Sequence, residues 1–310
     1  MRCLICYKPL EDSAENYHAE CLKKEFDINE MPAIDIDDAK LKSYAINLIE
    51  ANVAVTGVQP KLSLWLEKSK KNIRFTIVDR KSNFIIKPQS EAYESLPENE
   101  DLCMRLASAF GLQTAKHSLV KLPSGNLAYI TQRFDRFEEE KLACEDLCQL
   151  SETLTEHKYR GSYEKAGKTI RKFSAQPGLD ALSFFEAILF NFIIGNADMH
   201  LKNFSMIENK SGSFVLSPYY DLLSVFLAIE NETEQTALTV NGKKNKLTGN
   251  DFDALAENLS LNKKQTENVY EKFLAKNENA ERLIENSFLP ETQKEKLFEL
   301  MKVRIETLKN

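Results

Sequence analysis

The sequence lacks several features that mark specialised classes of protein. No apolar run reaches the length of a membrane-spanning helix, and the N-terminus turns polar too soon to predict a signal peptide. Six cysteines in 310 residues are too few to predict a disulfide scaffold, and we find no internal repeat or low-complexity segment. We therefore expect a globular, cytoplasmic protein that is long enough for two lobes and does not associate with a membrane.

The chain also lacks an excess of positive charge. It carries 41 lysine and arginine residues against 47 aspartate and glutamate residues, which gives a formal net charge of −6 at pH 7. This balance argues against direct DNA binding by the chain. Two local basic stretches, 158–172 and 243–246, are interpreted as solvated faces or loops.

Half of the cysteines lie close to the N-terminus. Cys3 and Cys6 form a Cys-x-x-Cys pair, and His18 and Cys21 follow as His-x-x-Cys. Four such ligands predict a tetrahedral structural zinc site with no open position for catalysis. The alternative is that the four residues are unrelated, bind no common metal and lie in a protein of a reducing compartment. The other cysteines are interpreted as buried or free thiols: Cys103, Cys144 and Cys148.

The first 135 residues predict mainly antiparallel strands. Leu62, Leu64 and Leu66 alternate along the chain, as on a strand with one buried face. Further elements are expected over these ranges: a short helix at 39–50 after an acidic linker, strands at 73–78 and 84–87, a helix at 98–110 capped by Gly111, and a hairpin of 117–121 with 127–133.

The remainder of the chain predicts a helical lobe. Residues 181–194 are apolar almost all round, so this helix must be central to its lobe. Other helices are expected at 145–154, 263–277 and 290–308. The predicted fold is α+β, divided into a Cys/His knuckle at 1–25, an N-lobe at 26–135 and a helical C-lobe at 136–310.

A group of polar residues follows the central helix. Asp198 precedes Asn203 by five residues, and Asp221 comes further downstream. An acid can orient a hydroxyl nucleophile, while an amide and a second acid can hold Mg²⁺ against phosphates. Lys202 could approach the γ-phosphate. The alternative is a polar loop with ordinary helix-capping acids, but the three residues together favour a phosphoryl-transfer site.

A lysine at the end of an apolar strand could bind the phosphates. Lys87 lies in Phe-Ile-Ile-Lys-Pro at 84–88, where its neighbours are expected to be buried. Such a lysine needs an anionic partner, although an exposed lysine at a strand end remains an alternative. Either Glu98 or Glu100 in the following helix could hold it, as in protein kinases.

The segment 56–61, Thr-Gly-Val-Gln-Pro-Lys, contains one glycine. It is therefore not a P-loop of the Gly-x₄-Gly-Lys-Ser/Thr type. Its backbone N–H groups could still cover phosphates. The residues available for this role are Gly57, Val58, Gln59 and Lys61.

Five segments together resemble the motifs of the HipA-type serine/threonine kinases, which are toxins of bacterial toxin–antitoxin systems. They occur in the family's order: Thr-Gly-Val-Gln-Pro-Lys-Leu-Ser at 56–63, Phe-Ile-Ile-Lys-Pro at 84–88, Gln-Arg-Phe-Asp-Arg at 132–136, Asp-Met-His-Leu-Lys-Asn-Phe-Ser at 198–205 and Tyr-Asp-Leu-Leu-Ser at 220–224.

The resemblance implies a protein-kinase-like two-lobed fold that uses ATP and Mg²⁺, with an antiparallel-sheet N-lobe and a mainly helical C-lobe. It implies these roles: Asp198 as the catalytic acid, Asn203 and Asp221 as Mg²⁺ ligands, Lys87 on the ATP phosphates, Gln132, Arg133 and Phe134 as the hinge contacting adenine, and His200 and Lys202 near the nucleotide. Family members phosphorylate a cytoplasmic protein, in known cases an aminoacyl-tRNA synthetase, and so arrest growth.

Family members also autophosphorylate in the glycine-bearing loop, which expels that loop and inactivates the kinase. Here Ala54 removes one possible acceptor, so modification is expected on Thr56. The chain resembles the short type similar to HipT. The expected partners are a separate protein similar to HipS, which supplies the missing N-terminal subdomain, and a helix-turn-helix antitoxin similar to HipB that binds any operator DNA.

Two other functions remain open. The chain could be a catalytically silent kinase-fold scaffold or co-repressor subunit, although a binding role would not need Lys87, Asp198, Asn203 and Asp221 together. It could also be a small-molecule kinase of related fold, since fold membership does not fix the substrate.

Overall fold

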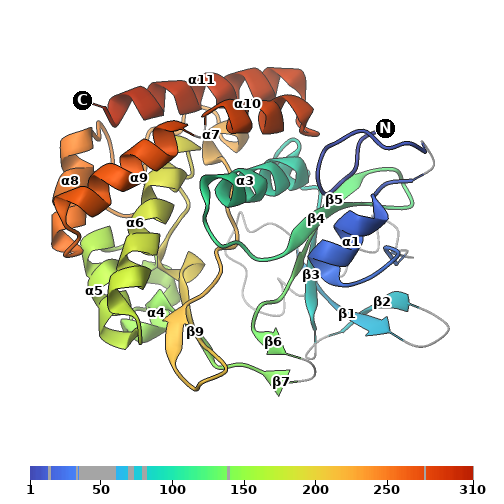
Figure 1. Cartoon of the computed structure of the whole chain (residues 1–310), viewed down its shortest axis with the longest axis horizontal. Helices are drawn as coiled ribbons and strands as arrows, with labels where there is room; N and C mark the ends of the chain where they lie inside the picture. Colours follow the sequence, from blue (N-terminus) through green and yellow to red (C-terminus); the bar gives the residue numbers. More distant parts are fainter. Residues whose placement is uncertain are drawn as a thin grey trace. The chain divides into compact units, whose positions relative to one another are not determined.

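The structure is a computed structural model that describes residues 1–12, 15–32, 34, 61–68, 73–78, 82–137, 140–275 and 277–309. The chain divides into two compact units. The first comprises Met1–Asp101, Ala115–Glu139 and Asn286–Leu289, and the second comprises Leu102–Thr114, Glu140–Glu285 and Pro290–Asn310. Figure 1 shows the course of the chain and the labels of its elements.

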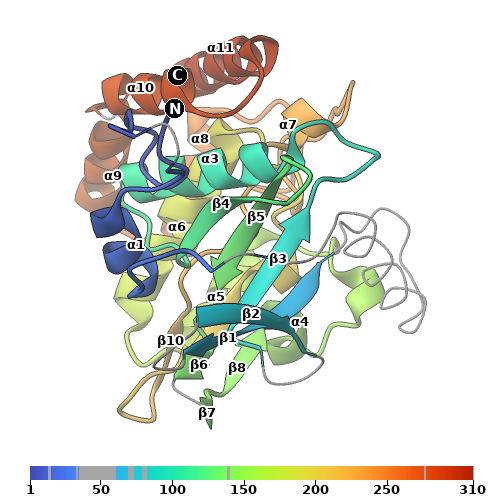
Figure 2. The ribbon, with the colours of Figure 1, turned by 90° about the vertical axis from the view of Figure 1, so that its right-hand side faces the viewer.

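The first unit is built on a five-stranded antiparallel sheet with the strand order β2-β1-β3-β5-β4. Figure 2 shows this sheet from the side on which its strands can be followed one by one. The strands have these bounds: β1 Leu62–Lys68, β2 Ile73–Ile77, β3 Phe84–Pro88, β4 His117–Lys121 and β5 Leu127–Gln132. The short strand β6, Arg136–Phe137, follows them. The predicted strands and the predicted hairpin are thus confirmed.

The N-terminal segment shares its core with the sheet. The helix α1, Ala19–Phe26, buries Leu22 and Phe26. These side chains belong to one apolar cluster with Leu62, Leu64 and Ile86 of the strands. The alternation predicted for β1 is therefore correct, because its inward-facing leucines meet the N-terminal segment on one face of the sheet.

One helix is divided between the two units. The helix α3, Leu96–Phe110, begins in the first unit, and its residues from Leu102 onward belong to the second. Gly111 follows it with a φ of 89°, a left-handed conformation that glycine adopts without steric cost.

The second unit is mainly helical. Its helices have these bounds: α4 Leu147–Leu150, α5 Tyr163–Phe173, α6 Pro177–Ile193, α7 Val225–Ala228, α8 Gly249–Asn258, α9 Lys263–Ala275, α10 Asn277–Asn286 and α11 Glu291–Thr307. The predicted central helix is α6, which packs against α5, α8 and α11 and buries most of its side chains. Rings of Phe184 and Phe192 contact Phe204 and Phe252 at centroid distances of 4.8 Å and 4.9 Å.

A small antiparallel sheet in the second unit has the order β10-β9-β8. Its strands have these bounds: β8 Cys144–Asp146, β9 Ser205–Glu208 and β10 Phe214–Leu216. Asp146 pairs with Ser205, and Leu216 pairs with Met206. The start of β9 therefore lies beside the ends of β8 and β10. The short strand β7, Glu140–Lys141, precedes β8.

Three sequence predictions for the second unit were wrong in part. The helix expected at 145–154 is the strand β8 followed by the one-turn helix α4. The basic stretch 158–172 is not only a solvated face, because the helix α5 within it buries Tyr163, Ala166 and Ile170. The helix expected at 263–277 ends at Ala275, and α10 follows it.

Other predictions lie outside what the structure tests. The helix expected at 39–50 falls outside the described residues, and the functional division at residues 25 and 135 stays a prediction. Among the helices that the structure describes, none is long and apolar enough to span a membrane.

Candidate active site

The first unit contains a buried lysine–glutamate pair. Lys87 lies on β3 with only 8% of its surface exposed, and its Nζ is 2.6 Å from Oε1 of Glu100 on α3. The Nζ also lies 5.6 Å from the ring centroid of Tyr129, the residue opposite Lys87 on β5. Of the two glutamates considered from the sequence, Glu100 is therefore the partner of Lys87.

Glu98 lies in a different environment on the same helix. Its Oε2 atom is buried without a hydrogen-bond partner among the described residues. Burial raises the pKa of Glu98 to about 7, and the nearby acids Asp101 and Glu94 add to the shift. Glu98 is therefore partly protonated near neutral pH and does not act as the counter-ion of Lys87.

The candidate hinge is held by main-chain contacts and by an aspartate. The N–H of Gln132 donates to Lys116 O at 2.8 Å, and the N–H of Arg133 donates to Asn83 O at 2.9 Å. The Arg133 guanidinium donates two hydrogen bonds to Asp135, at 2.9 Å and 2.8 Å. The two guanidinium groups of Arg133 and Arg136 lower the pKa of Asp135 against the opposing effect of burial, which is the largest single influence.

The segment predicted to cover the phosphates lies largely outside the described residues. Thr56, Gly57, Val58 and Gln59 lie outside the described residues, so their predicted roles stay predictions. Lys61 is described and is an exposed residue immediately before β1. Phe134, the third hinge candidate, lies in the turn after β5.

In the second unit, a glycine turns the chain from α6 into the candidate catalytic loop. Gly195 has a φ of 71°, and a Cβ placed there would lie 2.6 Å from Leu300 and 2.9 Å from Phe226. Asn196 then accepts a hydrogen bond from the N–H of Asp198 at 3.0 Å. Its amide donates to Asn191 of α6 at 2.7 Å, so the start of the loop is tied to the buried helix.

Asp198 accepts a hydrogen bond from one aromatic side chain and lies near a second. Tyr159 donates a short hydrogen bond to Oδ1 of Asp198, and Nε2 of His200 lies 4.0 Å from the same oxygen. Burial lowers the pKa of His200 to about 4, and the Lys158 ammonium adds to that shift. His200 is therefore neutral near pH 7 and does not form an ion pair with Asp198. The carboxylate itself is 42% exposed, so a substrate hydroxyl could reach it.

Two hydrogen bonds hold Asn203 within the loop. The amide nitrogen of Asn203 donates to the carbonyl of Asp198 at 3.1 Å, and the backbone N–H of Asn203 donates to His200 O at 3.0 Å. Because the amide nitrogen donates to Asp198 O, the amide oxygen is the atom of Asn203 that could act as a ligand. An amide oxygen is a hard ligand of the kind that Mg²⁺ prefers.

Asp221 reaches the same end of the small sheet from β10. The preceding residue, Tyr220, shares a hydrogen bond of 2.6 Å with Ser205 and donates another of 2.9 Å to Lys202 O. Asp221 has a φ of 59°, a left-handed conformation that is uncommon outside glycine and recurs at functional sites. The Asp221 carboxylate acts electrostatically on both Tyr159 and His200. Asn203 and Asp221 both offer oxygen ligands of the kind that Mg²⁺ prefers.

Lys202 has a partner that the sequence did not indicate. Its Nζ lies 2.6 Å from Oδ2 of Asp146, at the end of β8. The ammonium is 34% exposed and the carboxylate 15% exposed. Asp146 also caps the short helix α4 through the N–H of Gln149, so this carboxylate fixes both the helix and the lysine.

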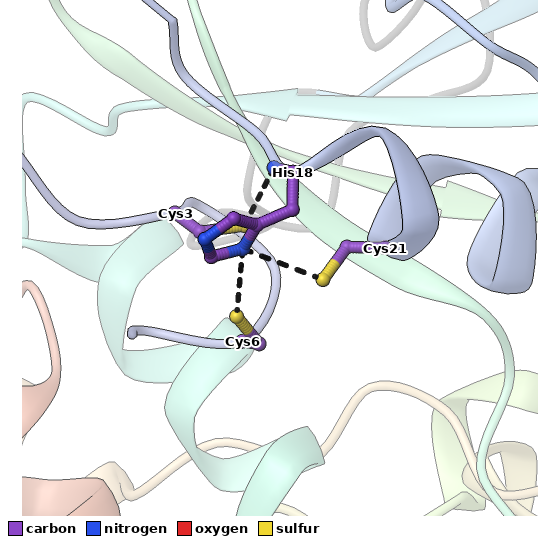
Figure 3. A group of neighbouring side chains, drawn as sticks. All are labelled: Cys3, Cys6, His18 and Cys21. Atoms are coloured by element: carbon purple, nitrogen blue, oxygen red, sulfur yellow. Dashed lines mark hydrogen bonds between the residues drawn. The ribbon is translucent and has the colours of Figure 1, made fainter. Parts of the chain in front are cut away.

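The structure also brings the four N-terminal ligand candidates together. Single ligand atoms of Cys3, Cys6, His18 and Cys21 all lie within 4.8 Å of one another. Figure 3 shows the three thiols arranged around the imidazole ring of His18. This is the only such cluster of three or more metal-binding side chains found among the described residues.

These features agree with the comparisons to known proteins. A profile of the HipA-like C-terminal domain matches residues 53–281, which is more than half of the chain. The chain therefore belongs to the family of HipA-like kinases, as the sequence motifs suggested. Its short, HipT-like form stays a prediction.

Two relatives of low sequence identity bear the names of kinases. A protein of Haemophilus influenzae that bears the name "Putative kinase" is 27% identical, over 93% of this chain and 92% of its own length. The serine/threonine-protein kinase toxin HipA of Shewanella oneidensis is 29% identical over 61% of this chain, and the match covers 47% of that protein. The chain thus spans about half of that toxin.

Two solved structures show the fold. HipA of Shewanella oneidensis, solved with HipB and its operator DNA, gives a TM-score of 0.66 at 22% identity, over 94% of this chain and 70% of that one. The Helicobacter pylori proinflammatory kinase CtkA gives 0.56 at 14% identity, over 78% and 93%. The predicted α+β, protein-kinase-like fold is therefore confirmed.

Proposed function

We propose that the chain is an ATP-dependent protein serine/threonine kinase. The observation that carries this proposal is the buried contact between Lys87 and Glu100. Burying an ion pair rarely stabilises a protein more than apolar residues of the same size would, so stability alone does not account for it. A strand lysine held by a helix glutamate is the arrangement with which protein kinases bind ATP phosphates.

Each unit supplies part of the required chemistry. The first contributes Lys87 for the phosphates and the 132–134 segment for adenine. The second contributes Asp198 for the substrate, Asn203 and Asp221 for Mg²⁺, and Lys202 as a positive charge fixed by Asp146. When bound, Mg²⁺ would neutralise charge on the β- and γ-phosphates.

The transfer step uses Asp198 on the acceptor hydroxyl. The carboxylate accepts the proton while the serine or threonine oxygen forms a bond to the γ-phosphorus. The bond from that phosphorus to the bridging oxygen breaks, and ADP leaves with the electron pair. Tyr159 holds Asp198 in place, and neutral His200 beside it neither competes for the proton nor pairs with the carboxylate.

We propose further that this kinase is the toxin of a toxin–antitoxin system. The relative HipA supports this role through its name and through its structure with HipB and operator DNA. A helix-turn-helix antitoxin similar to HipB and a small protein similar to HipS would be its partners. Thr56 would be the site of autophosphorylation, and the target would be a cytoplasmic protein such as an aminoacyl-tRNA synthetase.

The kinase proposal is tested by phosphate transfer from labelled ATP. Wild type, with Mg²⁺ and a bacterial extract, is expected to label itself or an extract protein. Asp198→Asn should lower that rate by about 100-fold or more, because the hydroxyl proton loses its acceptor. Asp253→Asn is the matched control, since Asp253 also accepts a tyrosine hydrogen bond, from Tyr270 at 2.9 Å, but lies on α8 outside the site.

Two results would contradict the proposal. ATP binding without transfer to any protein would favour the silent scaffold, and transfer only to free sugars or lipids would favour a small-molecule kinase.

The toxin role has its own test: induced expression of wild type should arrest growth, and Asp221→Asn should not. Growth arrest by both would show that toxicity does not depend on phosphate transfer.

A further inference from the structure

The cluster at the N-terminus has the dimensions of a tetrahedral metal site. The Nδ1 atom of His18 lies 3.3 Å from Sγ of Cys6 and 3.7 Å from Sγ of Cys21. Zinc with ordinary bond lengths to sulfur and nitrogen separates neighbouring ligand atoms by about 3.5 to 3.8 Å. These two distances are close to the edges of a zinc tetrahedron, and no two of the four ligand atoms lie more than 4.8 Å apart.

Hydrogen bonds around the cluster prepare its ligands. The Nε2 atom of His18 lies 3.0 Å from the carbonyl oxygen of Pro9, which can only accept, so Nε2 carries the proton. In the neutral ring this leaves a lone pair on Nδ1, directed toward the thiols. The backbone N–H of His18 also points at Sγ of Cys3 at 3.5 Å. Both contacts are typical outer partners of a metal-bound ligand.

The turn that carries Cys3 and Cys6 has an unusual conformation at its end. Tyr7, directly after Cys6, has a φ of 62°, which is rare for a bulky side chain. Its N–H donates to Cys3 O at 3.0 Å. A backbone of this kind persists where the surroundings impose it, and a shared metal on Cys3 and Cys6 would do so.

The same turn contacts the helix that carries Glu100. Tyr7 is 1% exposed, and its hydroxyl donates to Oδ2 of Asp101 at 2.5 Å. Asp101 is the neighbour of Glu100, and consecutive residues of a helix point about 100° apart. One turn of α3 is therefore held on one side by Lys87 and on another by Tyr7.

Other contacts join the N-terminal segment to the edge strand β4. Tyr17 donates to Leu119 O at 2.9 Å, and Glu25 accepts from the N–H of His117 at 2.9 Å. These contacts do not involve α3. They make Tyr17 a natural comparison for Tyr7, because both tyrosines anchor the same segment through a hydroxyl.

We propose that Cys3, Cys6, His18 and Cys21 bind one zinc ion, and that the metal-bound turn positions the Glu100 end of α3 through the contact of Tyr7 with Asp101. Glu100 in turn orients Lys87 for the ATP phosphates. Tyr7 and the zinc ligands are thus positioning residues for nucleotide binding. This second step rests on the proposed kinase function, whereas the metal site does not.

Metal content tests the first step. The full chain, purified under reducing conditions without chelator, should contain about one equivalent of zinc, measured by inductively coupled plasma mass spectrometry. Cys6→Ser should lose most of it. Cys144→Ser, which alters a partly exposed thiol outside the cluster, should keep it. A wild-type protein without zinc, even after zinc is added, or one with a Cys3–Cys6 disulfide, overturns the metal site.

Two matched tyrosine variants test the second step. Tyr7→Phe should keep its zinc but exchange the backbone amides of α3 at least about 5-fold faster, and should raise the KM for ATP by a similar factor with a smaller change in kcat. Tyr17→Phe should resemble wild type in both measurements. Equal behaviour of the two variants would mean that the segment acts only on stability and would overturn the positioning role. Zinc content and amide exchange need no ATP, so they remain informative if the chain proves not to be a kinase.

Discussion

At the scale of single residues, two glutamates on one helix show how position decides role. Glu98 and Glu100 are separated by a single residue on α3. Glu100 is buried against the Lys87 ammonium, whereas an oxygen of Glu98 is buried without a hydrogen-bond partner among the described residues. From the sequence, both glutamates were candidate partners of Lys87. They differ in the direction in which each side chain leaves the helix.

The raised pKa of Glu98 predicts a pH-dependent effect on stability. Its pKa is about 7 in the folded chain and 4.5 when unperturbed, so the folded state holds the proton more tightly between about pH 4.5 and 7. The stability from protonated Glu98 is present at pH 5 and lost as the pH rises through 7. Glu98→Gln should therefore raise the free energy of unfolding by about 1–2 kcal/mol at pH 8 relative to its effect at pH 5.

Urea unfolding of wild type and Glu98→Gln at the two pH values measures this effect. Phosphate transfer by the variant should remain close to wild type, because Glu98 does not contact Lys87. A difference in stability that is the same at pH 5 and pH 8 would show that Glu98 does not titrate in this range.

Tyr159 is a second residue with a predicted effect. Its hydroxyl holds the carboxylate of Asp198, so Tyr159→Phe should lower kcat by about 3- to 10-fold through poorer alignment of the proton acceptor. The KM for ATP should change little. Steady-state kinetics would show this, with Tyr270→Phe as the control that loses the equivalent bond to Asp253. An unchanged kcat would show that Tyr159 does not contribute to the transfer step.

At the scale of elements, the sequence predicted the helices and strands whose pattern lies within a few neighbouring residues. Alternating leucines predicted β1, and a run of apolar residues predicted α6. The hairpin expected at 117–121 and 127–133 is the pair of strands β4 and β5. Residues 145 and 146 were predicted as the start of a helix, but they form a strand by pairing with β9, about 60 residues away. No local pattern records such a partner.

The same limit applies to the candidate site. Asp198, Asn203 and Asp221 could be found because they lie at a suggestive spacing within one stretch of chain. Tyr159 and Asp146 could not, because they reach the loop from 39 and 56 residues away. A tyrosine and an aspartate outside a motif carry no signal of this kind. Only the fold identifies them.

Packing between helices gives a prediction at this scale. Gly167 lies on α5, where an added Cβ would come within 2.0 Å of buried Leu259. Gly167→Ala should lower the free energy of unfolding by about 1–2 kcal/mol, because overpacking exceeds the gain in helix propensity. Gly178→Ala, at an exposed position in the first turn of α6 with nothing within 4 Å of the added Cβ, should instead be neutral or stabilising by up to about 1 kcal/mol.

Thermal or urea unfolding of the two alanine variants provides the comparison. Equal effects would mean that Leu259 moves aside without cost and that α5 is not held by close approach at Gly167.

At the scale of the whole molecule, the proposed kinase function uses residues of both units. The first unit holds the Lys87–Glu100 pair and the second holds Asp198, Asn203 and Asp221. Neither set alone suffices for phosphoryl transfer, which requires the phosphates and the acceptor hydroxyl to be positioned together. The kinase proposal therefore predicts that substitutions in either unit weaken the same reaction.

A double-mutant cycle on phosphate transfer tests this claim most directly. Glu100→Gln in the first unit and Asp221→Asn in the second should each lower kcat/KM for ATP, by about 10-fold and about 100-fold or more. The double variant should lose much less than the product of the two, because residues that act as a unit are not additive. Strictly multiplicative losses of kcat/KM, or full activity in either single variant, would contradict the proposal that Glu100 and Asp221 serve the same kinase reaction.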